Sequence, residues 1–155
     1  QAKYEALSLA LKELEAVASE LQTRLSPMLG KIASEYMAKL TGGKYDKVAF
    51  DKTFAALVTP QGEEVAREAL YLSQGALDQM YLSLRLAMCR LLLSGDEPCP
   101  IVLDDALTNF DDVRAKAALE LLQEIAKERQ VLLFTCHSRE AAIAGHWPGV
   151  TVTKL

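Results

Sequence analysis

Two acidic residues and one histidine follow short apolar runs, in positions where they could act on a phosphate ester. Asp104 and Asp105 come directly after the apolar run 101–103, and His137 comes shortly after the run 131–134. One carboxylate could hold Mg²⁺, and the other could orient or deprotonate an attacking water. Adjacent residues of a strand point to opposite faces, so the two carboxylates cannot share one role. Alternatively, an aspartate here only caps a turn and the histidine is an ordinary loop residue.

A second set of small and polar residues precedes the clearest helical pattern of the chain. Ser73 and Gly75 lie in the run Leu72-Ser73-Gln74-Gly75, and apolar residues then repeat at helical spacing. These residues are Leu77, Met80, Tyr81, Leu84, Ala87, Met88, Leu91 and Leu92. A hydroxyl, a flexible glycine and free amides at a helix N-terminus can bind an anion. Ser73 also fits an ordinary N-cap, so both interpretations stay open.

The elements around residues 101–137 determine whether these groups can meet. Uniformly apolar runs of this length are typical of central strands covered on both faces. Between them we expect a helix capped by Asp112 and reaching about Arg129, with an apolar face of Val113, Ala117, Leu121, Leu122 and Ile125. Strand, helix and strand in this order predict parallel neighbours, whose carboxyl ends share one rim. A short helix over 138–144 and a last strand over 150–153 should follow.

The first third of the chain reads as helix followed by hairpin. Leucines and an alanine at alternating spacings of four and three give residues 2–26 a heptad seam, which is typical of a coiled coil or of an amphipathic surface helix. Pro27 resets this pattern, and a second helical face runs to Thr41-Gly42-Gly43, where glycine can end the helix. Residues 44–50 and 54–59 predict the two strands of a hairpin. Residues 63–70 are part strand and part loop.

Composition limits the class of protein. The chain has 155 residues, of which 50% are hydrophobic and 25% charged, with a net charge of −4. These values exclude a disordered chain and argue against a domain that binds nucleic acid over its whole surface. No apolar run is long enough to cross a membrane. Three cysteines without a CxxC pair fit a reduced, cytoplasmic protein, and we expect all three to be structural.

The order of these motifs resembles the C-terminal half of an ABC-type ATPase head. Residues 72–76 resemble the signature motif, residues 101–105 the Walker B motif, residues 108–111 the D-loop, and His137 the switch histidine. The heptad helix that leads directly into this lobe, and the run Leu40-Thr41-Gly42-Gly43-Lys44-Tyr45, are similar to the SMC, SbcC, RecF and RecN group of coiled-coil ATPases. The helix that follows the signature resembles that of the same group.

The resemblance implies a role for each site residue. Asp104 would hold Mg²⁺ and Asp105 would act as general base or orient water, while His137 would contact the γ-phosphate of ATP. In the signature, Leu72, Ser73 and Gly75 would bind the ATP held by a second head. In the D-loop, Asn109 and Asp111 would line the interface between the two heads.

The chain departs from the family pattern at three points. Gln74 and Ala76 replace a glycine and a polar residue of the usual signature. Asp105 stands where glutamate is usual, and its shorter side chain puts rapid turnover in doubt. No GxxxxGK[ST] loop occurs in the 155 residues, so nothing here would cradle the β- and γ-phosphates. The family places that Walker A lobe N-terminal to the coiled coil.

We therefore expect an α/β fold, with a parallel-cored sheet flanked by helices. Residues 1–26 would be a coiled-coil stub and residues 27–155 the C-terminal lobe of the head. The chain begins with Gln1 and not with Met, which suggests a piece of a longer protein.

The resemblance implies an ATPase in the complete head, using ATP and Mg²⁺, and a chain that is inactive alone. Its expected partners are the Walker A lobe of the same protein, a second head in a homodimer, DNA in repair or chromosome maintenance, and a nuclease, but no membrane. The expected location is the cytoplasm, with the nucleoid as an open alternative. A transporter-type ATPase fragment and a non-catalytic interaction module remain as alternatives.

Overall fold

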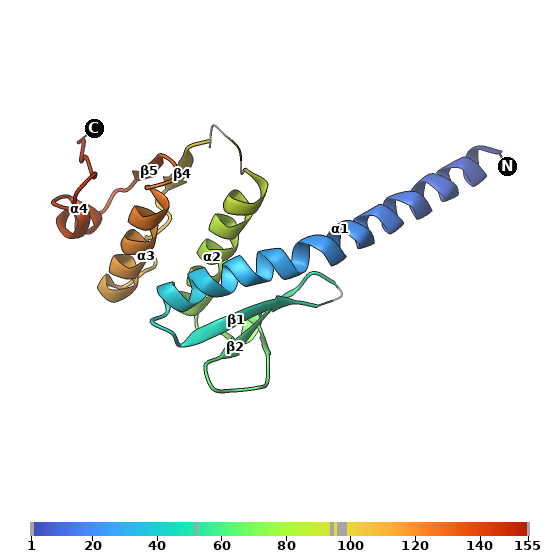
Figure 1. Ribbon diagram of the computed structural model, residues 1–155, viewed down its shortest axis with the longest axis horizontal. Helices are drawn as coiled ribbons and strands as arrows, with labels where there is room; N and C mark the ends of the chain where they lie inside the picture. The colour runs from blue at the N-terminus through green and yellow to red at the C-terminus, as the bar shows by residue number, and fades with distance from the viewer. Residues whose placement is uncertain (1, 52, 94, 96–98, 155) are drawn as a thin grey trace.

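The computed structural model describes residues 2–51, 53–93, 95 and 99–154. Four α-helices run over Ala2–Leu40 (α1), Gln74–Leu92 (α2), Asp112–Ile125 (α3) and Ser138–Ala144 (α4). The strands are Tyr45–Phe50 (β1), Ala56–Pro60 (β2), Arg67–Glu68 (β3), Ile101–Asp104 (β4) and Val131–Phe134 (β5), and Ala69–Tyr71 forms a 3₁₀ turn. The long helix α1 extends well beyond the body at the N-terminal end, while the C-terminus lies at the opposite end (Figure 1).

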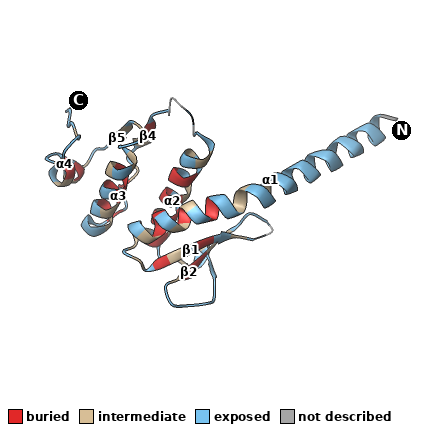
Figure 2. Ribbon diagram, in the orientation of Figure 1, coloured by how far each residue is buried: buried red, intermediate tan, exposed pale blue. Residues whose placement is uncertain are grey.

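Helix α1 is one continuous helix that passes through Pro27. Side chains 3–21 are exposed, and burial begins at Leu29 and continues to Leu40 (Figure 2). The sequence predicted that Pro27 resets the helical pattern. In the structure the helix continues through Pro27, and only the burial of its side chains changes near this residue. A proline removes one helical hydrogen bond, and the packing of the following turns offsets this loss. The predicted heptad seam of the first half lies open to solvent.

The glycines after α1 end the helix as predicted. Gly42 and Gly43 adopt φ values of 60° and 85°, in the left-handed region that glycine enters without steric cost. The amide of Gly43 donates to the carbonyl of Ala38 at 2.7 Å. The Thr41 hydroxyl donates to the carbonyl of Met37 at 2.7 Å and accepts from the amide of Tyr45 at 3.2 Å. This threonine therefore joins the end of α1 to the start of β1.

The hairpin packs closely against the second half of α1. Strand β1 pairs antiparallel with β2, as predicted, and β3 adds a third strand. A side chain at Gly30 would meet the carbonyl oxygen of Val48, so only glycine allows this approach of helix to strand. The amide of Val48 also donates to the Ser34 hydroxyl at 2.8 Å. Phe54, predicted to begin the second strand, instead lies in the turn with φ 65°.

Helix α2 packs on α1, and the residues that it buries are only partly those of the predicted helical repeat. Met80 and Ala87 are buried as expected, but Leu82 and Leu86 join them, whereas Tyr81, Met88 and Leu92 are exposed. Apolar residues surround most of α2, so the pattern alone does not select one side. The side chain of Gln79 donates to the carbonyl of Leu40, which fixes α2 to the end of α1.

Strands β4 and β5 form the predicted parallel pair, joined by α3. The prediction that both faces are covered is wrong. Leu103, Val131 and Leu133 pack against the core, whereas Val102 on the other face is 60% exposed and Phe134 is exposed as well. In the part of the chain that the structure describes, this sheet has two strands, and the side chains of its outer face are exposed to solvent.

Four further predictions in this half are corrected. Asp111, not Asp112, caps α3, and the helix ends at Ile125, short of Arg129. Val113 is exposed, and small residues let α3 pack closely through Ala115, Ala118, Leu119, Leu121 and Leu122. Residues 150–153 form no strand.

Candidate functional site

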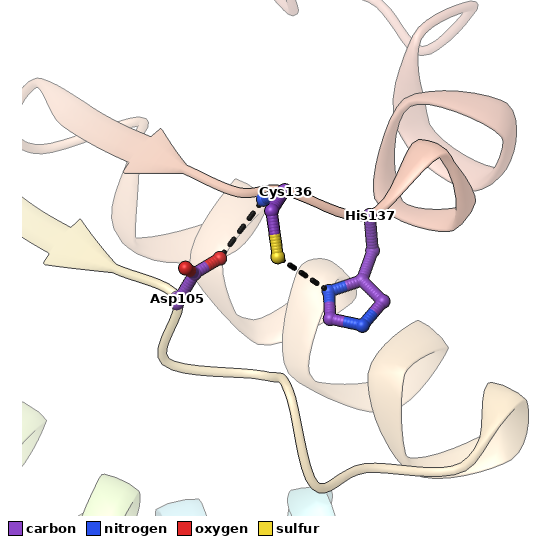
Figure 3. Close-up of side chains that lie close together, drawn as sticks. All are labelled: Asp105, Cys136 and His137. Atoms are coloured by element: carbon purple, nitrogen blue, oxygen red, sulfur yellow. Dashed lines mark hydrogen bonds between the residues drawn. The ribbon is translucent and has the colours of Figure 1, made fainter.

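The carboxyl ends of β4 and β5 bring Asp105 and His137 together, as the parallel pairing predicted. Ligand atoms of Asp105, Cys136 and His137 all lie within 4.8 Å of one another (Figure 3). Asp104 is not part of this cluster. Asp104 lies two residues after Val102 in β4, so its side chain is on the same, uncovered side of the sheet. The two adjacent carboxylates thus have different surroundings, as the sequence required.

The backbone and side chain of Asp105 are both held in place. Its φ of 44° lies in the left-handed region, which aspartate enters more readily than most residues. Its amide donates to the carbonyl of Phe134 at 2.9 Å, and its Oδ1 accepts from the amide of Cys136 at 2.9 Å. The bond from the Cys136 amide lowers the pKa of the Asp105 carboxyl. The ionised carboxylate is suited to orienting a water molecule, and its lowered basicity suits it less to removing a proton.

Cys136 lies exposed between Asp105 and His137. Its Sγ is 3.4 Å from Nδ1 of His137, and the Asp105 carboxylate raises the pKa of the thiol. The sequence analysis treated this cysteine as structural. Its position directly before His137 at the end of an apolar strand was the signal that could have placed it at the rim.

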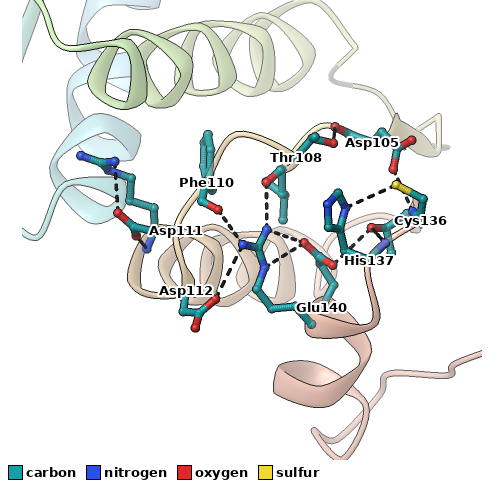
Figure 4. A network of polar contacts seen from close by, with 12 residues as sticks. Asp105, Thr108, Phe110, Asp111, Asp112, Cys136, His137 and Glu140 are labelled. Atoms are coloured by element: carbon teal, nitrogen blue, oxygen red, sulfur yellow. Dashed lines mark hydrogen bonds and ion pairs between the residues drawn. The ribbon is translucent and has the colours of Figure 1, made fainter.

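Arg139 holds the predicted D-loop in shape. Figure 4 shows the network of polar contacts around this loop, with Phe110, Asp112 and Glu140 labelled. Its guanidinium donates to the carbonyls of Phe110 at 2.6 Å and Leu107 at 3.0 Å. It also pairs with Glu140 at 2.8 Å, a carboxylate whose residue is only 4% exposed. Sequence reasoning missed Arg139, because its partners are backbone carbonyls of a loop whose path the sequence does not specify.

The predicted signature residues form a second group, around the N-terminus of α2. The Ser73 hydroxyl accepts from the amide of Ala76 at 3.4 Å, which confirms the predicted N-cap. The guanidinium of Arg114 lies against Gly75, where a side chain would collide with it. Arg114 also pairs with Asp111 at 3.1 Å, so α3 links the signature to the D-loop. Sequence analysis missed Arg114.

A pocket of about 510 Å³ opens beside this second group. Ser73 and Asp111 line it, together with four cationic side chains from α1, the following loop and α3: Lys39, Lys44, Arg114 and Lys116. Neither Asp105 nor His137 borders it. Leu72 is half-buried and Asn109 is exposed, and neither lines this pocket. The predicted site residues therefore form two separate groups in this chain.

Comparison with known proteins supports the fold. No model of a known protein family matches the chain. Over 112 residues the chain is 33% identical to the uncharacterized protein YhaN of Bacillus subtilis, a match that spans 72% of this chain and 12% of that protein.

Solved SMC head domains superpose on most of the chain. The Pyrococcus furiosus Smc head, bound to the C-terminal domain of ScpA, has a TM-score of 0.61 and 18% identity, covering 92% of this chain and 36% of its own. The Thermotoga maritima SMC head has a TM-score of 0.60 and 17% identity, covering 82% and 44%. An SMC ATPase studied for ATP-driven dimerization and DNA-stimulated activation has a TM-score of 0.67 and 19% identity, covering 87% and 83%.

These similarities show that the chain has the fold of the C-terminal part of an SMC ATPase head. They confirm the fold class inferred from the order of the motifs. Among the described residues, no helix is long and apolar enough to cross a membrane.

Proposed function

We propose that this chain is the C-terminal half of an ATPase head that hydrolyses ATP between two heads. One observation carries the proposal: Asp105 and His137 meet at the carboxyl rim of two parallel strands, while Asp104 faces the other way. Two differently directed carboxylates beside an imidazole suit a metal-assisted attack of water on a phosphate.

Each rim residue has a role in this proposal. Asp104 offers carboxylate oxygens, the ligands that Mg²⁺ prefers, at the uncovered face of the sheet. Asp105, held by the Cys136 amide, would orient the attacking water, and His137 would contact the γ-phosphate. Mg²⁺ would supply charge stabilisation of the phosphoryl group.

The uncovered face of β4–β5 is the proposed seat of the missing phosphate-binding lobe. The chain has no GxxxxGK[ST] loop, so the Walker A segment must come from elsewhere in the same protein. Val102 and Phe134 form an apolar surface on the face that Asp104 also shares. A lobe covering this face would bring its bound phosphates towards Asp104.

The second group of residues would serve the ATP of a partner head. Ser73 and the free amides of α2 point to a place suited to an anion, and Lys44 adds positive charge beside it, whereas Lys39 and Lys116 are each paired with a glutamate. The separation of this group from Asp105 and His137 fits a composite site in which each head supplies one group. Leu72 and Gly75 would complete the signature contact, while Asn109 and Asp111 would line the interface between heads.

We further propose the biological setting on the basis of the similar proteins. The related SMC structures concern ATP-driven dimerization, DNA-stimulated activation and binding of a ScpA domain. By extension, the complete protein would act on DNA in repair or chromosome maintenance, in the cytoplasm or on the nucleoid, with a nuclease as a further partner. The exposed heptad seam of α1 would pair with a second helix of the coiled coil.

Substitution of Asp105 tests the catalytic assignment. In the complete head, Asp105→Asn should lower the rate of ATP hydrolysis about 10²–10⁴-fold, as expected for loss of a catalytic carboxylate. Glu64→Gln is the matched control, because it makes the same chemical change at an exposed turn residue far along the chain from the rim. An unchanged rate for Asp105→Asn would refute the assignment and favour a non-catalytic interaction module.

Substitution of Ser73 tests the contact between heads. Ser73→Arg should abolish ATP-driven dimerization while leaving ATP binding within one head intact, because the group acts on the partner's nucleotide. The Gln61→Arg variant, at a turn outside both groups, controls for the added charge. Dimerization that survives Ser73→Arg would contradict the composite site.

A further inference from the structure

The side chains at the rim combine three kinds of metal ligand. Asp105 offers a carboxylate, Cys136 a thiol and His137 an imidazole nitrogen, and these atoms lie within 4.8 Å of one another (Figure 3). Thiolate and imidazole are ligands of Zn²⁺ and similar ions, whereas Mg²⁺ takes oxygen ligands. The mixed set therefore differs in chemistry from the carboxylate of Asp104.

The separation of two of the three groups is close to that of two ligands of one tetrahedral ion. With the usual zinc bond lengths, sulfur and nitrogen ligands of one ion lie about 3.6 Å apart. The measured separation between Cys136 Sγ and His137 Nδ1 is 3.4 Å. Little movement of these two side chains is needed for both to bind the same ion.

Neighbouring groups already hold the ligands in this arrangement. The Cys136 amide donates to Oδ1 of Asp105, so the carboxylate is turned towards the cysteine. The amide of His137 donates to the Thr135 hydroxyl at 3.0 Å, and that hydroxyl donates to the buried Glu140 at 3.2 Å. Such outer contacts reduce the conformational freedom that ligand binding would otherwise remove.

We propose that Asp105, Cys136 and His137 form a binding site for a single thiophilic divalent ion, with Zn²⁺ as its representative. Binding forms a Zn–S bond, and the thiol proton leaves to solvent. Three protein ligands leave the fourth position open to water. This part of the inference depends only on the three side chains and not on any ATPase activity.

Occupation of the site should stop ATP hydrolysis, and this consequence rests on the proposed function. The ion would take up Asp105 and His137, the groups proposed to orient water and to contact the γ-phosphate. Zn²⁺ would therefore inhibit hydrolysis by binding at the rim, without displacing Mg²⁺ from Asp104.

Binding is tested on the chain by titration with Zn²⁺ and by the thiolate absorption band of bound Co²⁺, with the thiols kept reduced. We expect one ion per chain and at least a tenfold weaker affinity in Cys136→Ala and in His137→Ala. Cys99→Ala and His146→Ala are the matched controls, because each removes an exposed residue of the same type outside the cluster. Equal affinity in wild type and Cys136→Ala, or loss of binding in Cys99→Ala, would overturn the site.

Inhibition is tested in the assembled head with Mg-ATP, and each variant is compared with its own rate in the absence of Zn²⁺. Zn²⁺ should inhibit the wild type and should inhibit Cys136→Ala at least tenfold less well. Specific Zn²⁺ binding in a head that hydrolyses no ATP would support the ion site and refute the proposed function. Hydrolysis that continues when the site is fully occupied would refute the inhibitory role.

Discussion

The two halves of the molecule are packed in different ways. Around the end of α1, the hairpin and α2 form a core with residues that are almost completely buried, such as Met37, Leu40 and Val58. The β4–β5 sheet, in contrast, is covered on one face only and leaves Val102 and Phe134 open. The polar rim residues lie on this incompletely covered half. The first half therefore buries its apolar side chains within the described residues, whereas the β4–β5 sheet leaves apolar side chains of one face exposed to solvent.

The largest effect on stability is expected in the packed half. Met37→Ala should lower the free energy of unfolding by about 2–5 kcal/mol, because it leaves a cavity in a core where Met37 is 0% exposed. Leu14→Ala, at a position that is 68% exposed, should change it by less than about 0.5 kcal/mol. Urea denaturation measures both values. If both variants lose a similar amount of unfolding free energy, the two ends of α1 do not differ in how much their packing stabilises the fold.

A smaller loss is expected where the rim is held together. Arg139→Ala should cost about 1–3 kcal/mol, because two loop carbonyls lose their donor and the buried Glu140 loses its cationic partner. Hydrogen exchange at residues 107–111 should rise in the variant. Arg139→Lys keeps the charge but cannot bridge both carbonyls. Its stability and its exchange rate should therefore lie between those of the wild type and Arg139→Ala. Unchanged exchange in Arg139→Ala would show that the loop holds its shape without this residue.

The ion pair between α1 and α3 should have a weak effect that depends on pH. Lys39 contacts Glu124 at 2.7 Å and lowers the pKa of its carboxyl from the ordinary value of 4.5. The pair therefore stabilises the fold above pH 4.5, and this contribution is lost as the pH falls through the lowered pKa. Both side chains are largely exposed, so Glu124→Gln should cost less than about 1 kcal/mol at pH 7.

Unfolding of wild type and Glu124→Gln should be compared at pH 7 and over a series of falling pH, and the difference should disappear once the pH lies below the lowered pKa of Glu124. Glu120→Gln, which removes another exposed pair within α3, is the control. If the difference in unfolding free energy between wild type and Glu124→Gln grows as the pH falls, the ionised Glu124 carboxylate is not what stabilises the fold.

The smallest effect on unfolding is expected at the open face of the sheet. Val102→Lys should change the stability of the chain by less than about 0.5 kcal/mol, because the side chain is already exposed. The same change should weaken association with the Walker A segment at least about tenfold, since it would bury an unpaired charge. Equilibrium binding of the two segments measures this, with Val152→Lys as an exposed control outside the sheet. Equal binding by both variants would mean that another surface is the interface.

The sequence predicted the features that depend on short-range pattern and topology. Parallel pairing of β4 and β5 follows from the strand–helix–strand order, and it alone brings Asp105 near His137. The stop at Gly42 and Gly43 and the N-cap at Ser73 are local and were equally predictable.

Features that depend on contacts between distant elements could not be predicted. Arg139 and Arg114 act on a loop carbonyl and on a glycine, and neither partner has a sequence pattern that points to it. The buried face of α2 could not be chosen from the sequence, because apolar residues surround that helix. The open face of the sheet was missed because an apolar strand looks the same whether its cover lies in this chain or in another.

The central claim is that this chain supplies half of an ATPase site, and reconstitution tests it most directly. Mg-ATP hydrolysis should be measured for the chain alone, for a segment of the same protein that carries a GxxxxGK[ST] loop, and for their mixture. We predict hydrolysis only in the mixture, and its loss with Asp105→Asn. Hydrolysis by the chain alone, or none in a mixture shown to assemble, would contradict the account.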